Sequence, residues 1–427
     1  MKALKIMRII PFVFIGLCYN CSDNEGEDIA EVIEETPEEP STPTKPENPG
    51  GGAEAGTSNI IKITSAAQLL SEIATAEAGD TLQLAAGTYA LTSRIILNQS
   101  GTENKPIVII SDKDGAIPIL DFSSMAENSS NQGFLLRGNY WVFKRLSIVG
   151  AGDNGMKIES SNNLIEFCSF SKCKDTGLQL DNGAANNLIL NCDSFYNADS
   201  SLENADGFAA KLTVGSGNKF VGCRAWQNLD DGWDGYLRET DNVTTTYENC
   251  WAFKNGYLED GSKGQGDGNG FKTGGSDDKK LKHNAVYTNC VAAGNVFDGF
   301  DHNSNRGSIT IYNCSAYQNG TNINFSSTNI AESLTVKNAA VLGDFGKLNA
   351  TSTDISNNSW MNGLTASAAD FESIDIELLS STRKADGSLP DIAFMHLVTD
   401  SDLIDAGVDV GLSFKGSAPD LGAFEKN

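Results

Sequence analysis

Positive charge is scarce in this 427-residue sequence, which has 31 Lys and Arg against 56 Asp and Glu and a net charge of −25. Such an acidic chain is poorly suited to nucleic acid, and it cannot hold a polyanion on a broad basic patch. If the ligand is acidic, a metal ion or a few local cations must mediate the contact. We therefore expect no nucleic-acid partner.

Long hydrophobic runs are also scarce, because the one in residues 1–21 is too short to span a bilayer and no other follows. Basic residues precede the run, which is typical of a secretory signal peptide. It ends in Cys18 and Cys21, and the acidic SDNEGED that follows resembles the start of surface lipoproteins of Bacteroidetes-type bacteria. We expect the lipid on Cys21, since the large Leu17 precedes Cys18, and hence a lipid anchor in the outer membrane at the cell surface. A freely secreted protein is the alternative.

Large apolar residues are nearly absent from residues 22–58, which are rich in Glu, Pro, Thr and Gly. Such a segment cannot bury a core, so we expect a flexible acidic linker there. The remaining residues, 59–427, are expected to form the folded domain.

Helical periodicity is missing between the strand-like segments, which excludes βαβ units. A glycine-containing unit recurs instead at about 22 to 40 residues, and such a period indicates stacked repeats. The copies are DNGMKIES (153–160), DTGLQLD (175–181), ADGFAAK (205–211), DDGWDGY (230–236), GNGFKTGG (268–275) and FDGFDHN (297–303). We predict an all-β solenoid whose coils hydrogen-bond to one another, with equivalent residues about 4.8 Å apart.

Cysteine and asparagine recur at fixed places in these units. Each second strand-like run ends in a cysteine: Cys168, Cys192, Cys223, Cys250, Cys290 and Cys314. We expect free thiols in a buried row, because consecutive members of one stacked row are poorly placed for disulfides. An asparagine recurs at the next turn: Asn197, Asn228, Asn255, Asn295 and Asn319. We expect each asparagine to adopt a left-handed conformation with stacked amides.

The two ends of the domain differ from the repeats. Residues 64–77 have the apolar spacing of an amphipathic helix with a Ser/Thr start, which predicts an N-terminal capping helix over the first coil. Residues from about 350 to 427 lack the repeat, and we expect them to pack along the solenoid as an irregular tail. Capping at both ends favours a monomer.

Acidic side chains gather where the units are stacked. If the large residue after each glycine points inward, the next residue points outward, and Asp234 and Lys272 become neighbours on one face. Two places before the large residue, Asp206 lies one rung below Asp231, with Asp230 alongside. Four carboxylates without Arg would repel one another, and all-oxygen ligands in a flexible turn favour calcium over magnesium. Turn formation beside glycine is the alternative for each Asp, and we favour it for Asp298 and Asp301.

Lys272 lies in GNGFKTGG, where glycines on both sides allow a substrate to approach the backbone. A lone surface lysine is usually only solvated. Stacked on a calcium cluster, however, Lys272 has the placement of a general base, and we expect neighbouring cations and partial burial to lower its pKa.

The ordered motifs ADGFAAK, NLDDGWD and GNGFKTGG in a Cys- and Asn-laddered solenoid resemble the family nine polysaccharide lyases, which include pectate and rhamnogalacturonan lyases. The resemblance covers roughly residues 60–427 and implies a right-handed parallel β-helix that cleaves a galacturonate-containing chain by β-elimination. It implies that Lys272 is the base and that one calcium is bound by four residues: Asp206, Asp230, Asp231 and Asp234.

Two alternatives to a lyase remain open from the sequence. An inverting hydrolase of the polygalacturonase type would need no calcium, although the lysine on the acidic cluster counts against it. A non-catalytic carbohydrate-binding solenoid would keep the calcium but not need Lys272. For the lyase, the sequence leaves open homogalacturonan or rhamnogalacturonan, and endo or exo action. Four cations are expected to be exposed near the groove as possible substrate contacts: Arg238, Lys263, His302 and Arg306.

Overall fold

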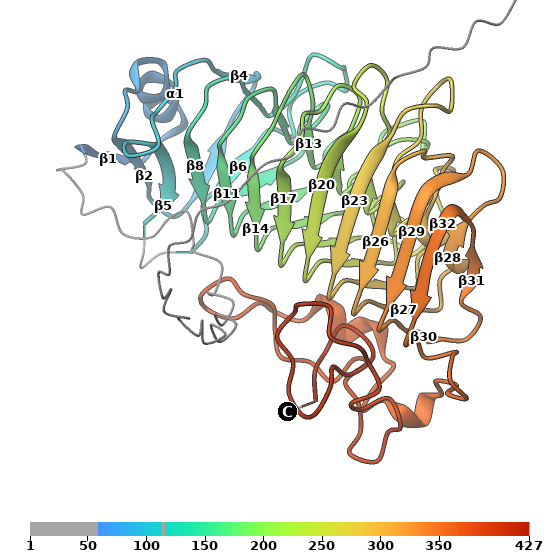
Figure 1. The fold of residues 1–427 in the computed structure, drawn as a ribbon. Coiled ribbons are helices and arrows are strands. Elements are labelled where there is room, and N and C mark those ends of the chain that lie inside the picture. Colours follow the sequence, from blue (N-terminus) through green and yellow to red (C-terminus); the bar gives the residue numbers. More distant parts are fainter. Residues whose placement is uncertain (1–58, 113–115, 427) are drawn as a thin grey trace, which may run out of the picture. The chain divides into compact units, whose positions relative to one another are not determined.

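The computed structural model describes residues 59–112 and 116–426. The expected signal peptide, its cysteines Cys18 and Cys21, and the linker lie outside the described residues. In the described part, the chain forms a coil with three parallel sheets as its sides (Figure 1). Each turn of the coil adds one strand to each sheet, and we call the sheets 1, 2 and 3 in the order in which the chain passes through them.

Each sheet is built from strands that recur once per coil. Sheet 1 has twelve strands: β1 (Asn59–Ile63), β2 (Asp80–Leu84), β5 (Ile107–Ser111), β8 (Trp141–Lys144), β11 (Leu164–Glu166), β14 (Leu188–Leu190), β17 (Asn218–Val221), β20 (Val243–Glu248), β23 (His283–Thr288), β26 (Ser308–Tyr312), β29 (Ala331–Lys337) and β32 (Ala350–Ser356). Sheet 2 has ten: β3 (Thr88–Ala90), β6 (Ile119–Asp121), β9 (Ser147–Val149), β12 (Ser169–Ser171), β15 (Asp193–Phe195), β18 (Arg224–Trp226), β21 (Trp251–Phe253), β24 (Val291–Ala293), β27 (Ser315–Tyr317) and β30 (Ala340–Leu342). Sheet 3 has ten: β4 (Ile95–Leu97), β7 (Phe134–Leu136), β10 (Met156–Ile158), β13 (Leu178–Leu180), β16 (Phe208–Ala210), β19 (Trp233–Asp234), β22 (Phe271–Lys272), β25 (Asp298–Asp301), β28 (Thr321–Phe325) and β31 (Gly346–Leu348).

Aromatic rings fill the interior behind sheet 3. Trp233 stacks on Phe208 at 5.1 Å between ring centroids and on Phe271 at 4.9 Å, and Phe271 stacks on Phe300 at 5.1 Å. All four rings are buried. The predicted inward direction of these residues is therefore confirmed, and the residue after each of them points to the outer face of sheet 3.

The predicted cysteine row is also confirmed. The six cysteines of the row are buried free thiols, together with Cys173. Their thiols lie near strand carbonyls, as in the approach of Cys223 Sγ to the Ile189 oxygen at 3.3 Å. They act as small apolar residues inside the coil.

The asparagine row forms a continuous ladder of side-chain amides. The Nδ2 of Asn228 donates to Oδ1 of Asn255 at 3.0 Å, and Asn255 donates in the same way to Asn295 at 3.0 Å. The prediction of stacked amides is right, but the left-handed conformation was assigned to the wrong residue. The residue before each asparagine has positive φ, as at Gln227 (47°) and Lys254 (56°), and this turn aims the amide along the stack.

A second amide ladder was not predicted. Asn163 donates to Asn187 at 3.0 Å, and Asn187 donates to Asn218 at 3.0 Å, all three being buried. It fastens the turn that leads into sheet 1.

The N-terminal end is capped by α1 (Ala66–Thr75), as predicted. The Ser65 side chain accepts from the Gln68 backbone N–H at 3.2 Å and caps the helix start. Leu69 and Ile73 bury the apolar face of the helix against the first coils. None of the described helices is long and apolar enough to cross a membrane.

The C-terminal tail begins later than predicted, because β31 and β32 complete one more coil up to Ser356. After it, residues 357–426 run as loops with the short 3-10 helices η1 (Ala368–Asp370) and η2 (Ile376–Ser380) and pack over sheet 2 (Figure 1). Asp193 binds Arg224 at 2.8 Å and the tail residue Arg383 at 2.7 Å. These buried ion pairs and the apolar packing hold the tail on sheet 2, so the tail does not cover the outer face of sheet 3.

We predict that Asn255→Ala lowers the free energy of unfolding by about 2 to 4 kcal/mol, because it leaves the buried amides of Asn228 and Asn295 without their partner. Urea titration followed by circular dichroism measures this change. Asn104 is exposed, and Asn104→Ala is the control, expected within about 0.5 kcal/mol of wild type. Equal effects of the two changes would contradict a stabilising ladder.

Candidate functional site

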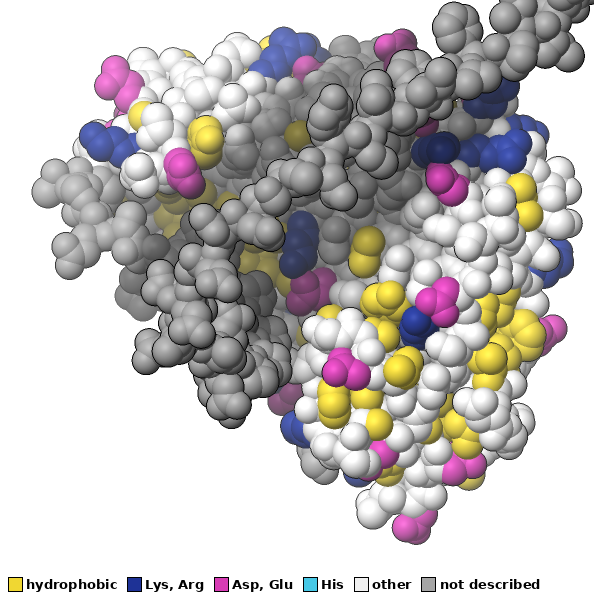
Figure 2. Space-filling model, in the orientation of Figure 1, with side chains coloured by type: hydrophobic (Ala, Val, Ile, Leu, Met, Phe, Trp, Pro, Cys, Tyr) yellow, Lys and Arg dark blue, Asp and Glu magenta, His cyan; other side chains and the backbone are white. Residues whose placement is uncertain are grey.

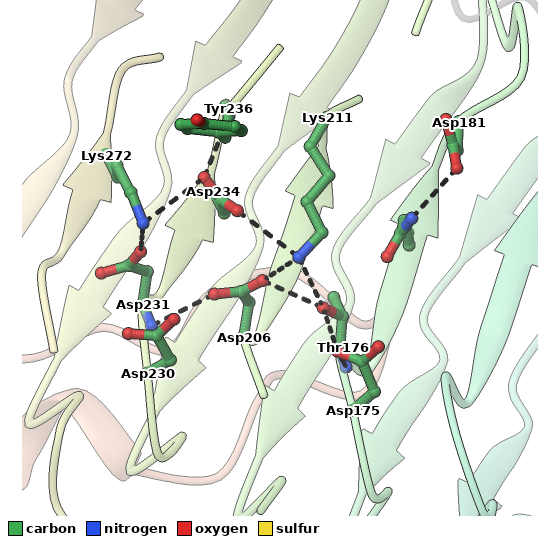
Figure 3. Close-up of polar contacts among 12 residues, drawn as sticks. Asp175, Thr176, Asp181, Asp206, Lys211, Asp230, Asp231, Asp234, Tyr236 and Lys272 are labelled. Atoms are coloured by element: carbon green, nitrogen blue, oxygen red, sulfur yellow. Dashed lines mark hydrogen bonds and ion pairs between the residues drawn. The ribbon is translucent and has the colours of Figure 1, made fainter. Parts of the chain in front are cut away.

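The predicted outward row of sheet 3 is confirmed by the strand register. Asp234 pairs with Ala209 on one side and Lys272 on the other, and Lys272 pairs with Asp301. Figure 3 shows the Asp234 and Lys272 side chains facing each other over neighbouring strands. The strand register alone thus places a lysine beside a carboxylate.

A row of polar residues runs through the turn that precedes these strands. The Asp231 N–H donates to Asp206 Oδ1 at 3.3 Å, and the Asn269 N–H donates to Asp231 Oδ1 at 2.9 Å. The Asp298 N–H continues the row by donating to Asn269 Oδ1 at 2.9 Å. Each side chain therefore caps the backbone of the next coil and is held in a fixed orientation.

Three of the four predicted metal ligands lie together. Carboxylate oxygens of Asp206, Asp230 and Asp231 all lie within 4.8 Å of one another, and the three residues are buried. Asp234 lies outside this group, since its oxygens face Lys272 at 3.9 Å and Lys211 at 3.4 Å (Figure 3). The structure brings Asp234 to the rim of the group but not into it.

The three-carboxylate group fits a hard divalent cation. Oδ2 of Asp231 is buried and accepts no hydrogen bond, although the Lys272 ammonium lies 3.0 Å away. Buried carboxylate oxygens of three residues that lie this close together are suitable ligands for calcium or magnesium. The set contains no sulfur or imidazole that would favour zinc.

The protonation of the acidic residues reflects their crowding. Burial raises the pKa of Asp230, and Asp231 and Asp206 raise it further, to about 9. Burial also raises the pKa of Asp231 to about 7, against the opposing effect of Lys272. Asp234 differs, because Lys272 and Lys211 outweigh burial and hold its pKa below the ordinary value.

Lys272 lies against the acidic group with 11% of its side chain exposed. Its Nζ is 3.0 Å from Asp231 and 3.4 Å from Asp267. Burial favours the neutral amine, but Asp231, Asp234 and the other carboxylates outweigh it and raise the pKa of Lys272 well above its ordinary value. The expectation that the pKa of Lys272 is lowered is therefore wrong when only the protein's own groups act on it. Its charged neighbours are carboxylates, which stabilise the ammonium form.

Lys211 is a member of the site that the sequence reasoning missed. Its Nζ lies 2.7 Å from Asp206 Oδ2 and 3.4 Å from Asp234 Oδ2. The motif ADGFAAK ends in this lysine, three residues after the inward Phe208. Asp181 and Tyr236 stand at the same position in the neighbouring repeats. A comparison of this position across the repeats could have identified Lys211 from the sequence.

The four cations expected as substrate contacts have different surroundings. Arg238 is exposed, with 59% of its side chain accessible, and Lys263 lies over the Tyr257 ring at 5.6 Å. His302 is wrongly predicted as exposed, because it is 2% accessible and its Nε2 contacts the Asn305 carbonyl at 2.8 Å. Burial also lowers its pKa, so it is not a surface cation.

Arg306 is also less available than expected. Its guanidinium donates to the carbonyls of Lys279 at 2.8 Å and Ile330 at 3.1 Å and to Oδ1 of Asn329 at 3.2 Å. These bonds fasten loops to each other, so the side chain is half-buried and committed to structure.

Residues 51–339 match the family model described as Pel9A-like, right handed beta helix region. The chain belongs to this family. The match confirms the predicted right-handed parallel β-helix and the resemblance to the family nine polysaccharide lyases.

Curated proteins are similar to this chain over most of its length. Pectate lyase L of Dickeya chrysanthemi is 38% identical over 369 residues, covering 83% of this chain and 84% of the relative. Pectate lyase L of Paenibacillus polymyxa is 42% identical, covering 78% and 77%.

Two solved structures agree with the family assignment. Pectate lyase Pel9A superposes with a TM-score of 0.75 at 36% identity, covering 84% of this chain and 90% of that one. A rhamnogalacturonan lyase superposes with a TM-score of 0.70 at 28% identity, covering 78% and 92%.

We predict that calcium raises the melting temperature of the wild-type protein and that Asp231→Asn removes most of this rise. A ligand that binds only the folded state stabilises it, and the substitution removes a buried charge from the group. Differential scanning fluorimetry with and without chelator measures it. Asp391, at 91% side-chain exposure in the tail, supplies the control Asp391→Asn, which should keep the full rise. A rise that survives Asp231→Asn would place the cation elsewhere.

Proposed function

We propose that this protein is a calcium-dependent lyase that cleaves the uronate-containing chains of pectin by β-elimination. The observation that carries the proposal is Lys272 in register beside a buried group of three carboxylates. The pectate lyases among the relatives support the reaction class.

The carboxylates of Asp206, Asp230 and Asp231 would hold the calcium, with Asp234 as a fourth ligand at the rim. When bound there, calcium would supply positive charge that stabilises the negative charge developing at C5. The ladder bonds from Asn269 and Asp231 keep these side chains oriented before substrate arrives.

Lys272 would remove the proton. Its Nζ in the neutral form accepts the proton from C5, and the electrons of that C–H bond form the double bond between C4 and C5. The C4–O bond breaks, and the leaving oxygen takes a proton from solvent. Carboxylates that also bind a cation stabilise the Lys272 ammonium less, so the neutral amine forms more readily.

The acidic polymer reaches an acidic protein through a few local positive charges. On the face drawn in Figure 2, which shows sheet 1 and the tail, Lys and Arg of the described residues stand in separate groups among acidic and uncharged residues. A polyanion held through a cation at the site would need no broad basic patch. Polygalacturonate is the first substrate to test, since pectate lyases are the more similar relatives, with rhamnogalacturonan second.

We predict that wild-type protein releases unsaturated products from one of these polymers and that chelator or Lys272→Ala lowers the rate by a factor of about 10² to 10⁴, as loss of a general base does. Ultraviolet absorbance of the conjugated double bond follows the reaction. Lys384→Ala, in the tail, is the matched control and should keep the wild-type rate.

Chain cleavage without absorbance would replace the lyase with the inverting hydrolase. Calcium binding without any cleavage of either polymer, and unchanged carbohydrate binding in Lys272→Ala, would support the non-catalytic solenoid instead.

We also propose that a lipid on Cys21 anchors the protein in the bacterial outer membrane, on the sequence of residues 1–28 alone. Cys21→Ser should move the protein from the membrane fraction to the soluble fraction, whereas Cys18→Ser should not. Release by Cys18→Ser only would shift the anchor to Cys18, and no release by either would contradict lipidation.

A further inference from the structure

Lys211 binds two of the four acidic residues from the side opposite Lys272. Figure 3 shows its ammonium between Asp206 and Asp234, with Thr176 beneath. The Thr176 hydroxyl donates to the same Asp206 oxygen, Oδ2, at 3.0 Å. Only 15% of the Lys211 side chain is exposed, so its charge is held in place.

The loaded site carries a larger excess of negative charge without this lysine. Asp206, Asp230, Asp231 and Asp234 supply four negative charges when ionised, and calcium supplies two positive charges. Lys272 must be neutral to accept a proton, so it contributes none at that moment. A substrate carboxylate would then meet a site with excess negative charge, and like charges at this range repel strongly.

We propose that Lys211 is a positioning residue that sets the charge of the site: through Asp206 and Asp234 it weakens the hold on calcium and lets the loaded site accept an anionic substrate. The proposal rests on the proposed function.

An ion pair elsewhere on the same coil is more exposed than the contacts of Lys211. Lys219, in β17, pairs with Glu248 of β20 at 2.8 Å on sheet 1, and 37% of its side chain is exposed. Lys211 is instead inserted between two carboxylates in a buried group, where a positive charge changes the affinity for every other ion. Lys219→Gln is therefore the matched control for removing a charge.

Isothermal titration with calcium chloride and steady-state rates on polygalacturonate, or on whichever polymer wild type cleaves, test the proposal. Lys211→Gln should bind calcium about tenfold more tightly and raise KM about tenfold at saturating calcium, since one nearby positive charge is lost. Lys211→Arg keeps the charge and should stay within about threefold of wild type in both measurements. Lys219→Gln should change neither.

Weaker calcium binding in Lys211→Gln, with a lower melting temperature, would reduce Lys211 to a structural support and overturn the proposal. Unchanged affinity and KM would overturn it as well. A wild-type protein that binds no calcium or forms no unsaturated product would contradict the proposed function itself. The proposal for Lys211 would then fail too, before any variant is compared.

Discussion

The rest of the structure depends on backbone pairing between successive coils, which keeps equivalent residues in one register. Parallel pairing at about 4.8 Å gives every residue a neighbour of the same structural position above and below. The Asn228, Asn255 and Asn295 amides fasten the turns to that register, because each satisfies the next one's buried polar groups. A slip of one residue would turn the Trp233 ring to solvent and Asp234 into the core.

This constraint favours some side chains and penalises others. Stacked rings such as Trp233 and Phe271, and stacked thiols, gain contact from identical neighbours. Stacked carboxylates repel, and burial makes the repulsion stronger. Sheet 3 accepts them where a lysine can stand among them, as Lys272 and Lys211 do on the two sides of Asp234. The crowding continues to Asp301, where burial and Asp298 raise the pKa to about 8.

The sequence predicts whatever follows the two-residue period of a strand and the repeat register. It therefore identifies the inward rings, the neighbours Asp234 and Lys272, and Asp206 below Asp231. Turns and loops follow no such period, so the positive φ at Gln227 could not be predicted. The alternation does continue to His302, which is inward two residues after Phe300, and to Lys211, which is outward three residues after Phe208, and both were missed. The pKa of Lys272 depends on the summed charges of several coils, which the strand period does not give.

A lyase that uses Lys272 and the carboxylate group breaks the chain without adding water. The most direct test is mass spectrometry of the two fragments formed from a defined uronate oligomer. Elimination predicts fragment masses that sum to the mass of the parent oligomer, with the unsaturated fragment lighter than its saturated counterpart by one water. Fragment masses that sum to the parent plus one water would contradict the account.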